Sequence, residues 1–315
     1  MMNATELQRF LDNALGERAN CWQQGGVNAL GALSAPDSLF GAYPSLFRGD
    51  VHRLWAEWFL GACVDVDRLA RDASSYPLIY KTVRDYCVQA AQPAFAAEEL
   101  AKVLARLAND EACRLRVQQK RPSISRGDRQ LMVDLADGQP RCWICGYKFR
   151  EEAIENFLEC KQTHSIPPPR IVDLFKPIGL KPRDMGVEVD HVLPLSKGGS
   201  DGDNLRMACG WCNRHKSNHA SLYDVGGGDR PGSTAGSYYS LPQPLWVVRM
   251  LAHTGRSEIS GTSSNAAELT VTLRRAGGKA TPPNLRVVTC EESPIEQRVS
   301  LEKALQITRQ NPRQA

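Results

Sequence analysis

Apolar residues recur at helical spacing through the first third of the chain. The first run consists of Leu7, Phe10, Leu11, Ala14 and Leu15. Positions spaced i, i+3, i+4, i+7 and i+8 lie on one face of a helix, so this run predicts an amphipathic helix. Gly16 directly follows the run and is the residue type that favours a helix C-terminus. The pattern therefore predicts a first helix that ends at about residue 16.

A second run with the same spacing consists of Val51, Leu54, Trp55, Trp58 and Phe59. Asp50 precedes this run, and aspartate is a preferred N-cap residue, so we expect the second helix to begin there. The segment 25–44 contains glycine and serine and is expected to connect the first two helices. Core packing is the simplest role for the aromatic face, and we assign it no binding role.

Further helices are predicted over about 77–91 and 97–117. In the latter, the apolar stripe consists of Leu100, Val103, Leu104 and Leu107. These helices and the two before them predict an all-α N-terminal domain over residues 1–122.

The pattern changes after residue 122. Two short helices are expected first, and a segment with five prolines is predicted to be an irregular insertion. A glycine-rich break follows, then two alternating strands that could pair, and a last amphipathic helix. These segments span 127–136, 151–160, 161–182, 226–233, 269–273, 285–289 and 293–309. The chain is therefore predicted to be an α+β protein, with a central domain over 123–224 and a small α+β C-terminal region over 225–315.

Composition limits the class of protein. The chain has 315 residues, of which 42% are hydrophobic and 23% charged, as is usual for a soluble globular protein. The N-terminus lacks the features of a secretory signal, and no stretch has the roughly 20 apolar residues that span a bilayer. We therefore expect a cytoplasmic protein that does not enter membranes.

Positive charge is concentrated ahead of the central domain. Residues 1–113 carry 10 basic and 14 acidic side chains, whereas residues 114–150 carry 9 basic and 3 acidic ones. The basic cluster consists of Arg114, Arg116, Lys120, Arg121, Arg126 and Arg129. Such a cluster could neutralise phosphates, and Arg121, Arg126 and Arg129 are the candidates for nucleic-acid binding. The alternative is a solvated helix end and linker.

Four of the ten cysteines form two C-x-x-C pairs, Cys142 with Cys145 and Cys209 with Cys212. Zinc favours four thiolates in tetrahedral geometry, and two such pairs would form a closed, structural site. The 63 residues between the pairs form a tolerable insertion, because the entropy cost of loop closure grows only logarithmically with length. A redox-active pair would be expected in a βαβ pattern, which neither pair has. The pairs therefore predict one structural zinc.

Between and after these pairs stand the sequences EVDH (188–191), PLSKGG (194–199), NL (204–205) and CNRHK (212–216). Together with the two C-x-x-C pairs, this ordered set resembles the HNH endonuclease family, in its zinc-supported branch with a ββα-metal core. The resemblance covers about 80 of the 315 residues. Asn213 fills the third position of the family's motif, so the chain has the His-Asn-Asn variant. The flanking regions resemble no family that we can name.

The resemblance implies metal-dependent hydrolysis of DNA. A neutral imidazole can take a proton from water, so His191 is the candidate general base. Asp190 and Asn213 offer hard oxygen ligands for magnesium or manganese, and the cation would act as a Lewis acid on the phosphate. Asn204 matches the family's residue that fixes the loop and orients the base. Since neighbouring residues of a strand point to opposite faces, Asp190 and His191 can share one site only where the strand ends or distorts.

Neighbouring residues leave alternatives open. His215 is a second candidate ligand for the catalytic cation, and Glu188 is either an outer ligand or a solvated carboxylate. Lys216 occupies the family's basic position and is a candidate phosphate contact. His219 lies four residues after His215, a spacing that can bind zinc on a helix. Cys160 and His164 share that spacing but remain unassigned.

The sequence is compatible with several biological roles. The resemblance favours anti-phage defence or a mobile element, with the N-terminal helical domain contacting a protein partner or a second copy of the chain. One alternative is a zinc-knuckle module that binds nucleic acid without catalysis. Intact Asp190, His191 and Asn213 argue against that alternative. Another is a toxin that degrades nucleic acid.

Overall fold

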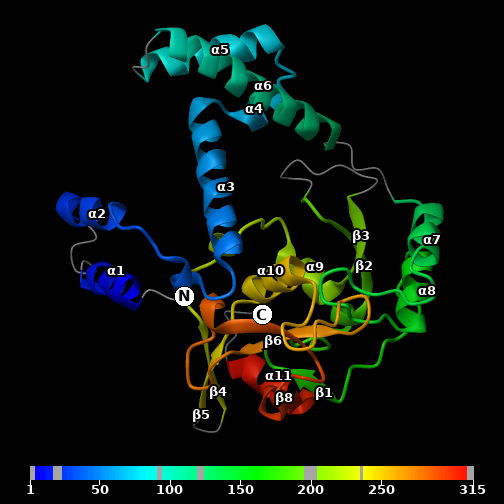
Figure 1. Cartoon of the computed structure of the whole chain (residues 1–315). Helices are drawn as coiled ribbons and strands as arrows, with labels where there is room; N and C mark the ends of the chain where they lie inside the picture. The colour runs from blue at the N-terminus through cyan, green and yellow to red at the C-terminus, as the bar shows by residue number, and fades with distance from the viewer. Residues whose placement is uncertain are drawn as a thin grey trace.

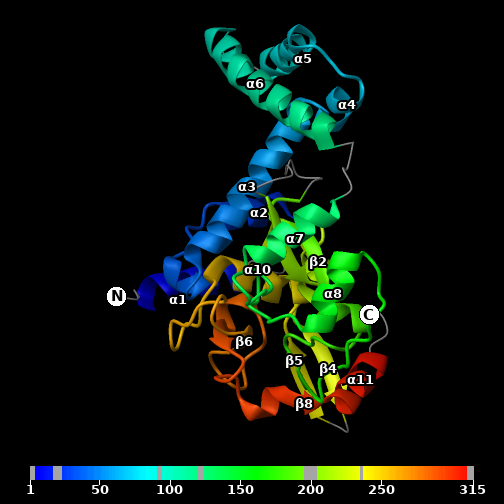
Figure 2. The same ribbon diagram turned by 90° about the vertical axis from the view of Figure 1, so that its right-hand side faces the viewer.

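A long helix, α3 (Pro44–Cys63), connects two separately packed parts of the molecule. In Figures 1 and 2 it runs upward from a mixed α/β body to a small cluster of helices, which we call the head. This computed structural model describes residues 4–16, 23–90, 94–118, 124–194, 204–234 and 237–310. Within these ranges, no helix is both long and apolar enough to cross a bilayer.

The head is made of α4 (Val66–Arg71), α5 (Tyr76–Gln89) and α6 (Ala94–Gln118). These bounds confirm the two helices predicted over about 77–91 and 97–117. The apolar stripe predicted for α6 is only partly right, since Leu104 is buried but Val103 and Leu107 are 58% and 50% exposed. The side chains of α6 that face the head's core are instead mostly alanines. They are Ala97, Ala101, Ala105, Ala108 and Ala112, all with no exposed surface.

The prediction for α3 was wrong in two respects. The helix begins at Pro44, with proline in the first turn, so Asp50 lies inside the helix. Asp50 is buried, and its carboxylate accepts hydrogen bonds from Arg249 and from the backbone N–H of Leu222. Second, Trp58 is 64% exposed, because no element of the described residues packs over the upper half of α3, where the helix crosses from body to head. The aromatic face of α3 is therefore surface and not core.

Two further helices precede α3. The first, α1 (Ala4–Gly16), ends where predicted but buries none of its residues. The second, α2 (Gln24–Gly31), lies where a connecting loop was expected. Its sequence, QGGVNALG, contains three glycines, and these obscured the helix in the sequence pattern.

The body contains four antiparallel pairs of strands among the described residues. The pairs are β1 (Ile171–Asp173) with β8 (Arg298–Ser300), β2 (Val187–His191) with β3 (Leu205–Cys209), β4 (Arg230–Thr234) with β5 (Ser237–Leu241), and β6 (Leu269–Leu273) with β7 (Leu285–Thr289). Around them lie the helices α7 (Arg126–Asp134), α8 (Glu151–Glu159), α9 (Gly210–Lys216), α10 (Pro244–Thr254) and α11 (Leu301–Gln310). The chain is thus a mixture of helices and small sheets, with helices at its N-terminus.

Some predicted segments of the body need correction. The pairing of β6 with β7 and the positions of α7 and α8 agree with the prediction. However, β6 is buried on both faces, whereas a half-buried strand was expected. The break predicted over 226–233 overlaps β4, and the last helix begins at Leu301 because residues 298–300 form β8. The proline-rich insertion contributes β1, which pairs with this distant strand.

One hydrophobic core extends through the body, from Tyr43 to Ile307. It joins the lower end of α3, both cysteine pairs, α10 and the β6–β7 sheet. The backbone N–H of Leu269 in β6 donates to the carbonyl oxygen of Cys145 at 2.7 Å, so the C-terminal sheet supports the first cysteine pair directly. The boundaries proposed at residues 122 and 225 stay predictions.

Candidate functional site

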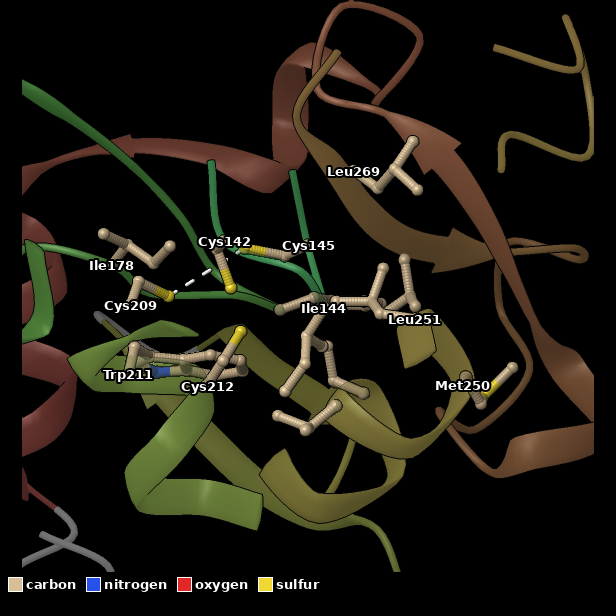
Figure 3. Packing of buried hydrophobic residues seen from close by; sticks show 14 of the residues in the cluster. Cys142, Ile144, Cys145, Ile178, Cys209, Trp211, Cys212, Met250, Leu251 and Leu269 are labelled. Atoms are coloured by element: carbon tan, nitrogen blue, oxygen red, sulfur yellow. Dashed lines mark hydrogen bonds between the residues drawn. The ribbon is translucent and has the colours of Figure 1, made fainter. Parts of the chain in front are cut away.

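The four cysteines of the two C-x-x-C pairs converge in the body core. Their sulfur atoms all lie within 4.8 Å of one another, and all four residues are buried. In Figure 3 the sulfurs of Cys142, Cys145, Cys209 and Cys212 point toward one shared space. The sequence prediction that the two pairs meet, across the intervening residues, is confirmed.

The geometry of the cluster fits zinc. With Zn–S bonds of about 2.3 Å, tetrahedral geometry places two sulfurs about 3.8 Å apart. Cys145 Sγ and Cys209 Sγ are 3.9 Å apart. Burial raises the pKa of Cys209 and of Cys212 well above the usual thiol value, whereas at Cys142 burial is outweighed by hydrogen bonds from the other three cysteines, which lower the pKa. A cation would stabilise all four residues as thiolates. The donor set, spacing and burial could therefore hold a zinc ion.

Glycines allow the two turns of the cluster to form. Gly146 adopts φ +70°, and its backbone N–H donates to Cys142 O at 2.8 Å. A β-carbon at this position would lie 2.3 Å from Ser264 O, so no other residue fits. Gly210 lies against the segment before β2, where a β-carbon would come within 2.0 Å of Arg183 O. Both glycines let backbone approach backbone at the cysteine cluster.

The β2–β3 hairpin is followed immediately by α9, and polar side chains from these elements meet. Glu188 and Asp190 are two residues apart on β2 and therefore share one face of the strand. On α9, Asn213 and Lys216 are three residues apart and share one face of the helix. Glu188 contacts Asn213, and Asp190 contacts Lys216. Two strand carboxylates thus face an amide and an ammonium group on the helix.

Asp190 is only 4% exposed, and both of its oxygens accept hydrogen bonds. Lys216 Nζ donates to Oδ1 at 2.8 Å, and Trp143 Nε1 donates to Oδ2 at 3.0 Å. Lys216 Nζ also donates to the backbone oxygen of His191, at 2.5 Å. A carboxylate has about four lone-pair sites, so these two bonds leave about two sites of Asp190 for a further ligand. The indole of Trp143 links this carboxylate to the first cysteine pair.

The amide of Asn213 has a defined orientation. Its Nδ2 donates to Glu188 Oε2 at 2.6 Å. Since the oxygen and nitrogen of an amide lie on opposite sides, this bond turns Oδ1 away from Glu188. Glu188 is therefore a partner of Asn213 in this structure, and not merely a solvated carboxylate.

Asn204 holds the chain directly after His191. Its Oδ1 accepts from the N–H of Leu193 at 2.8 Å, and its Nδ2 donates to Leu193 O at 2.9 Å. Its backbone oxygen also accepts from the N–H of Val192, at 2.8 Å. His191 is the last residue of β2 and lies opposite Leu205, so three bonds to Asn204 fix the backbone where the hairpin ends.

Residues of the basic cluster ahead of the first cysteine pair have different environments in the structure. Two of them make structural contacts. The guanidinium of Arg116 donates to the carbonyl oxygens of Leu69, Ala70 and Ser74, at the end of α4. Arg129 donates to Phe157 O and stacks on the Phe157 ring.

Two of the remaining arginines lie at the surface. Arg126 begins α7 and is exposed, whereas Arg114 forms an ion pair with Glu111 at 2.5 Å. Lys120 and Arg121 lie outside the described residues. The cluster thus contains members with structural contacts as well as members at the surface.

His215 lies away from the acidic face of β2. It packs against Trp211 with ring centroids 4.8 Å apart. Burial, followed by the charges of Arg214, Arg230 and Lys181, lowers its pKa to about 3. The ring is therefore neutral, and cations surround it. His219, four residues later, has Nδ1 at 3.8 Å from Asp224 Oδ2. Among the described residues, the two histidines belong to no cluster of metal-ligating side chains.

Lys176 was not singled out in the sequence. It is 1% exposed, and its Nζ donates to Glu268 Oε1 at 2.5 Å and to Leu269 O at 2.7 Å. Burial opposes its charge, but Cys145 and Glu268 outweigh that effect and raise the pKa well above its usual value. A fully buried ammonium group thus lies beside the cysteine cluster. A lysine within the apolar run LFKPIG was the only signal in the sequence.

Residues 178–219 match a family model described as HNH endonuclease. The chain carries an HNH domain. The match includes β2, β3, α9 and the second cysteine pair, and it confirms the family resemblance for this segment. Comparison with curated proteins and with solved structures found no match. An HNH domain indicates nuclease activity in general, and hence a nucleic-acid substrate.

Proposed function

We propose that this chain is a metal-dependent HNH endonuclease that hydrolyses phosphodiester bonds of DNA, by nicking or by double-strand cleavage. The observation that carries the proposal is the contact between the acidic face of β2 and the polar face of α9, inside the segment that matches the family. We propose that this hairpin and helix form the ββα-metal core.

His191 is the proposed general base. Its imidazole takes a proton from the attacking water, whose oxygen then bonds to phosphorus while the 3′ oxygen leaves. Asn204 is the proposed positioning residue, since it fixes the backbone of Val192 and Leu193, which directly follow the base. A further bond, from Lys216 Nζ on α9 to the backbone oxygen of His191, fixes the backbone of the base itself.

Asp190 and Asn213 are the proposed ligands of magnesium or manganese. A carboxylate and an amide oxygen suit these hard cations, which keep several waters and need few protein ligands. When bound, the cation neutralises charge on the phosphate and stabilises the leaving oxygen. Glu188 supports this role because it orients the amide of Asn213, whereas the position of His215 against Trp211 makes it the weaker candidate.

Zinc at Cys142, Cys145, Cys209 and Cys212 is the proposed structural metal, and it would join the first cysteine pair to the start of α9. Arg126 is proposed to contact DNA phosphates, together with Arg121. Lys216 stays a proposal as a phosphate contact, although its ammonium group is buried and already bonds Asp190 and His191 O. Arg129 stays a proposal in this respect, although its guanidinium already binds Phe157 O. The domain boundaries of 1–122, 123–224 and 225–315 are proposed from the changes in sequence pattern along the chain.

The proposed setting is the cytoplasm, in anti-phage defence or in a mobile element. A protein partner or a second copy is proposed to contact the N-terminal helices, and the exposed aromatic side chains of α3 support this contact. A binding module without catalysis and a toxin stay as alternatives. The ordered contacts of Asp190, Asn204 and Asn213 favour catalysis over the binding module.

Cleavage of supercoiled plasmid with added magnesium or manganese tests the proposal. We expect His191→Ala to lower the rate by about 10²–10⁴-fold, since this is the usual effect of removing a general base. DNA affinity and thermal stability should be unchanged. His164→Ala is the matched control, because His164 is exposed and lies on a segment outside the site. Cleavage by His191→Ala at the wild-type rate would exclude this mechanism.

A further inference from the structure

A cavity of about 230 Å³ lies behind α9. Trp211, Arg214 and His215 contribute to its wall from the helix, whereas Asn213 and Lys216 face the β2 strand on the other side. The remaining wall comes from the segment before β2, from β4 and β5, and from α11. The cavity is therefore separate from the proposed cation site, although both border the same helix.

Apolar side chains form most of this wall. They include Leu174, Leu241, Leu305 and Ile307, and the buried indole of Trp211 lies beside them. Small-molecule sites are usually concave and mostly apolar, with few polar groups that fix the orientation of the ligand. The apolar part of the cavity suits the hydrocarbon or aromatic body of a small molecule.

Three of the five polar side chains in the wall are cationic, and His215 is neutral. Lys181, Arg214 and Arg230 contribute positive charge, and Asp184 is the carboxylate in the wall. Asp184 is fully buried and is already paired with Arg214. The positive charges of Lys181 and Arg230 are therefore left in excess at the cavity.

Arg230 has no acidic partner in the part of the chain that the structure describes. Its Nε donates to the carbonyl oxygen of Pro242 at 3.0 Å, and burial lowers its pKa to about 10. A half-buried guanidinium without a carboxylate loses hydration that no opposite charge replaces, so an anion would stabilise it. Guanidinium groups bind carboxylate and phosphate oxygens particularly well.

We propose that this cavity binds a small molecule with one carboxylate or phosphate group on an apolar body, the anionic group lying against Arg230 and Lys181. The ligand contacts Trp211 and the leucines with its apolar part. This site does not depend on the proposed nuclease activity, because binding needs neither the cysteine cluster's metal nor the residues on the other face of α9.

Calorimetric titration of the full chain with benzoate and with phenyl phosphate tests the site and separates the two anionic groups. We expect at least one of these probes to bind with a stoichiometry of one. Benzamide, which matches benzoate in size but lacks the charge, should bind at least tenfold more weakly. The same titrations with the His191→Ala protein should give wild-type affinities, so loss of cleavage and loss of binding are distinguishable.

Two variants assign the binding to this cavity. Arg230→Gln should weaken the charged probe at least tenfold, and Lys181→Gln should weaken it several-fold, since Lys181 is exposed at the rim. Arg275→Gln is the matched control, because it removes the same charge from an exposed position that does not line the cavity. Its affinity should equal that of the wild type. If Arg230→Gln does not fold, Lys181→Gln carries the test alone.

Three results would overturn the proposal. The first is equal binding of benzamide and benzoate, which would leave an apolar cavity with no preference for anions. The second is wild-type affinity for both charged probes in the Arg230→Gln and Lys181→Gln proteins. The third is weaker binding of duplex DNA by Arg230→Gln with unchanged binding of the probes, which would assign Arg230 to the DNA backbone.

Discussion

The body and the head of this molecule are stabilised in different ways. The body core surrounds four cysteines and contains fully buried charged groups, among them Lys176 and Asp184. Among the described residues, the hydrophobic core of the head contains 13 buried residues, of which six are alanines, and no charged side chain of the head is buried. Small side chains on α6 let α4 and α5 pack closely against it. The body therefore relies on paired charges and on a cysteine cluster that could hold a metal, whereas the head relies on close packing of helices.

This difference agrees with the proposed location of the catalytic site in the body. Buried polar groups must keep their partners, so a body built from them holds Asp190, Asn204 and Asn213 in defined orientations. Among its described residues the head has polar contacts, such as those of Arg116 with the backbone at the end of α4, but no fully buried charged side chain. Its contribution to function, like that of α3, is expected to come from its surface.

Loss of a cysteine from the cluster should produce the largest difference in stability between the body and the head. Cys209→Ser removes one of four thiolates, and structural zinc contributes on the order of 10–16 kcal/mol to the folding of small domains. We expect the body to lose protection from hydrogen exchange, together with cleavage, while α5 and α6 keep theirs. Elemental analysis should find one zinc per wild-type chain and much less in the variant.

Cys113→Ser is the control for this experiment, because Cys113 is exposed on α6 and belongs to no metal cluster. Its zinc content and stability should equal those of the wild type. Active wild-type protein without zinc would contradict the prediction, as would equal loss of protection in body and head.

Replacement of Lys176, the buried lysine beside the cysteine cluster, should cause the next largest loss of stability. Lys176→Met leaves the Glu268 carboxylate, 31% exposed, without its partner. Breaking a buried ion pair in this way costs about 3–5 kcal/mol, and the partial exposure of Glu268 places the expected loss at about 3 kcal/mol. Chemical denaturation measures it. Lys279→Met is the matched control, since Lys279 is 76% exposed in its pair with Asp229, and it should cost under about 1 kcal/mol.

Much of the body could be predicted from sequence because its signals are local or chemical. The spacing of Cys142, Cys145, Cys209 and Cys212 predicted their convergence. Alternation predicted β6, and the glycine turn after it suggested β7 as its partner. The contacts that join distant segments had no such signal. Lys176 meets Glu268 across 92 positions of the chain, and β1 meets β8 from within a proline-rich segment. Neither pairing follows from periodicity, because periodicity describes one element at a time.

The N-terminal helices could be located from sequence, but their buried faces could not. In α6 the larger side chains Val103 and Leu107 suggested the core face, yet the alanine stripe is buried instead. In α3 the spacing of Trp55, Trp58 and Phe59 is the same as that of a buried stripe. Helical periodicity shows which residues share a face, but it does not show whether another element covers that face.

A substitution in the alanine stripe should destabilise the head alone. Ala105 has no exposed surface, so Ala105→Leu adds volume between α6 and its neighbours and should cost about 1–3 kcal/mol. Hydrogen exchange should rise in α4, α5 and α6, with the β2–β3 hairpin unchanged. Leu107→Ala is the control, because Leu107 is half exposed and its loss should change stability by about 0.5 kcal/mol or less. Equal destabilisation of body and head would mean that the two cores unfold together.

The smallest change in stability is expected for a substitution in the exposed aromatic face of α3. Its size shows whether this face is free in solution or covered by another molecule. Trp58 is 64% exposed and Trp246 is 3% exposed, with its Nε1 bonded to Leu222 O. Trp246→Ser should cost about 3–5 kcal/mol, as removal of a buried tryptophan usually does. Trp58→Ser should cost about 0.5 kcal/mol or less in a monomer, because its ring is already largely in contact with water.

If a second copy covers α3, the wild-type melting temperature should rise with protein concentration, and Trp58→Ser should abolish that rise. Light scattering gives the mass of each species. A concentration-independent melting temperature and a monomeric mass would exclude self-association through this face, and the aromatic side chains of α3 would then be free surface in the isolated protein.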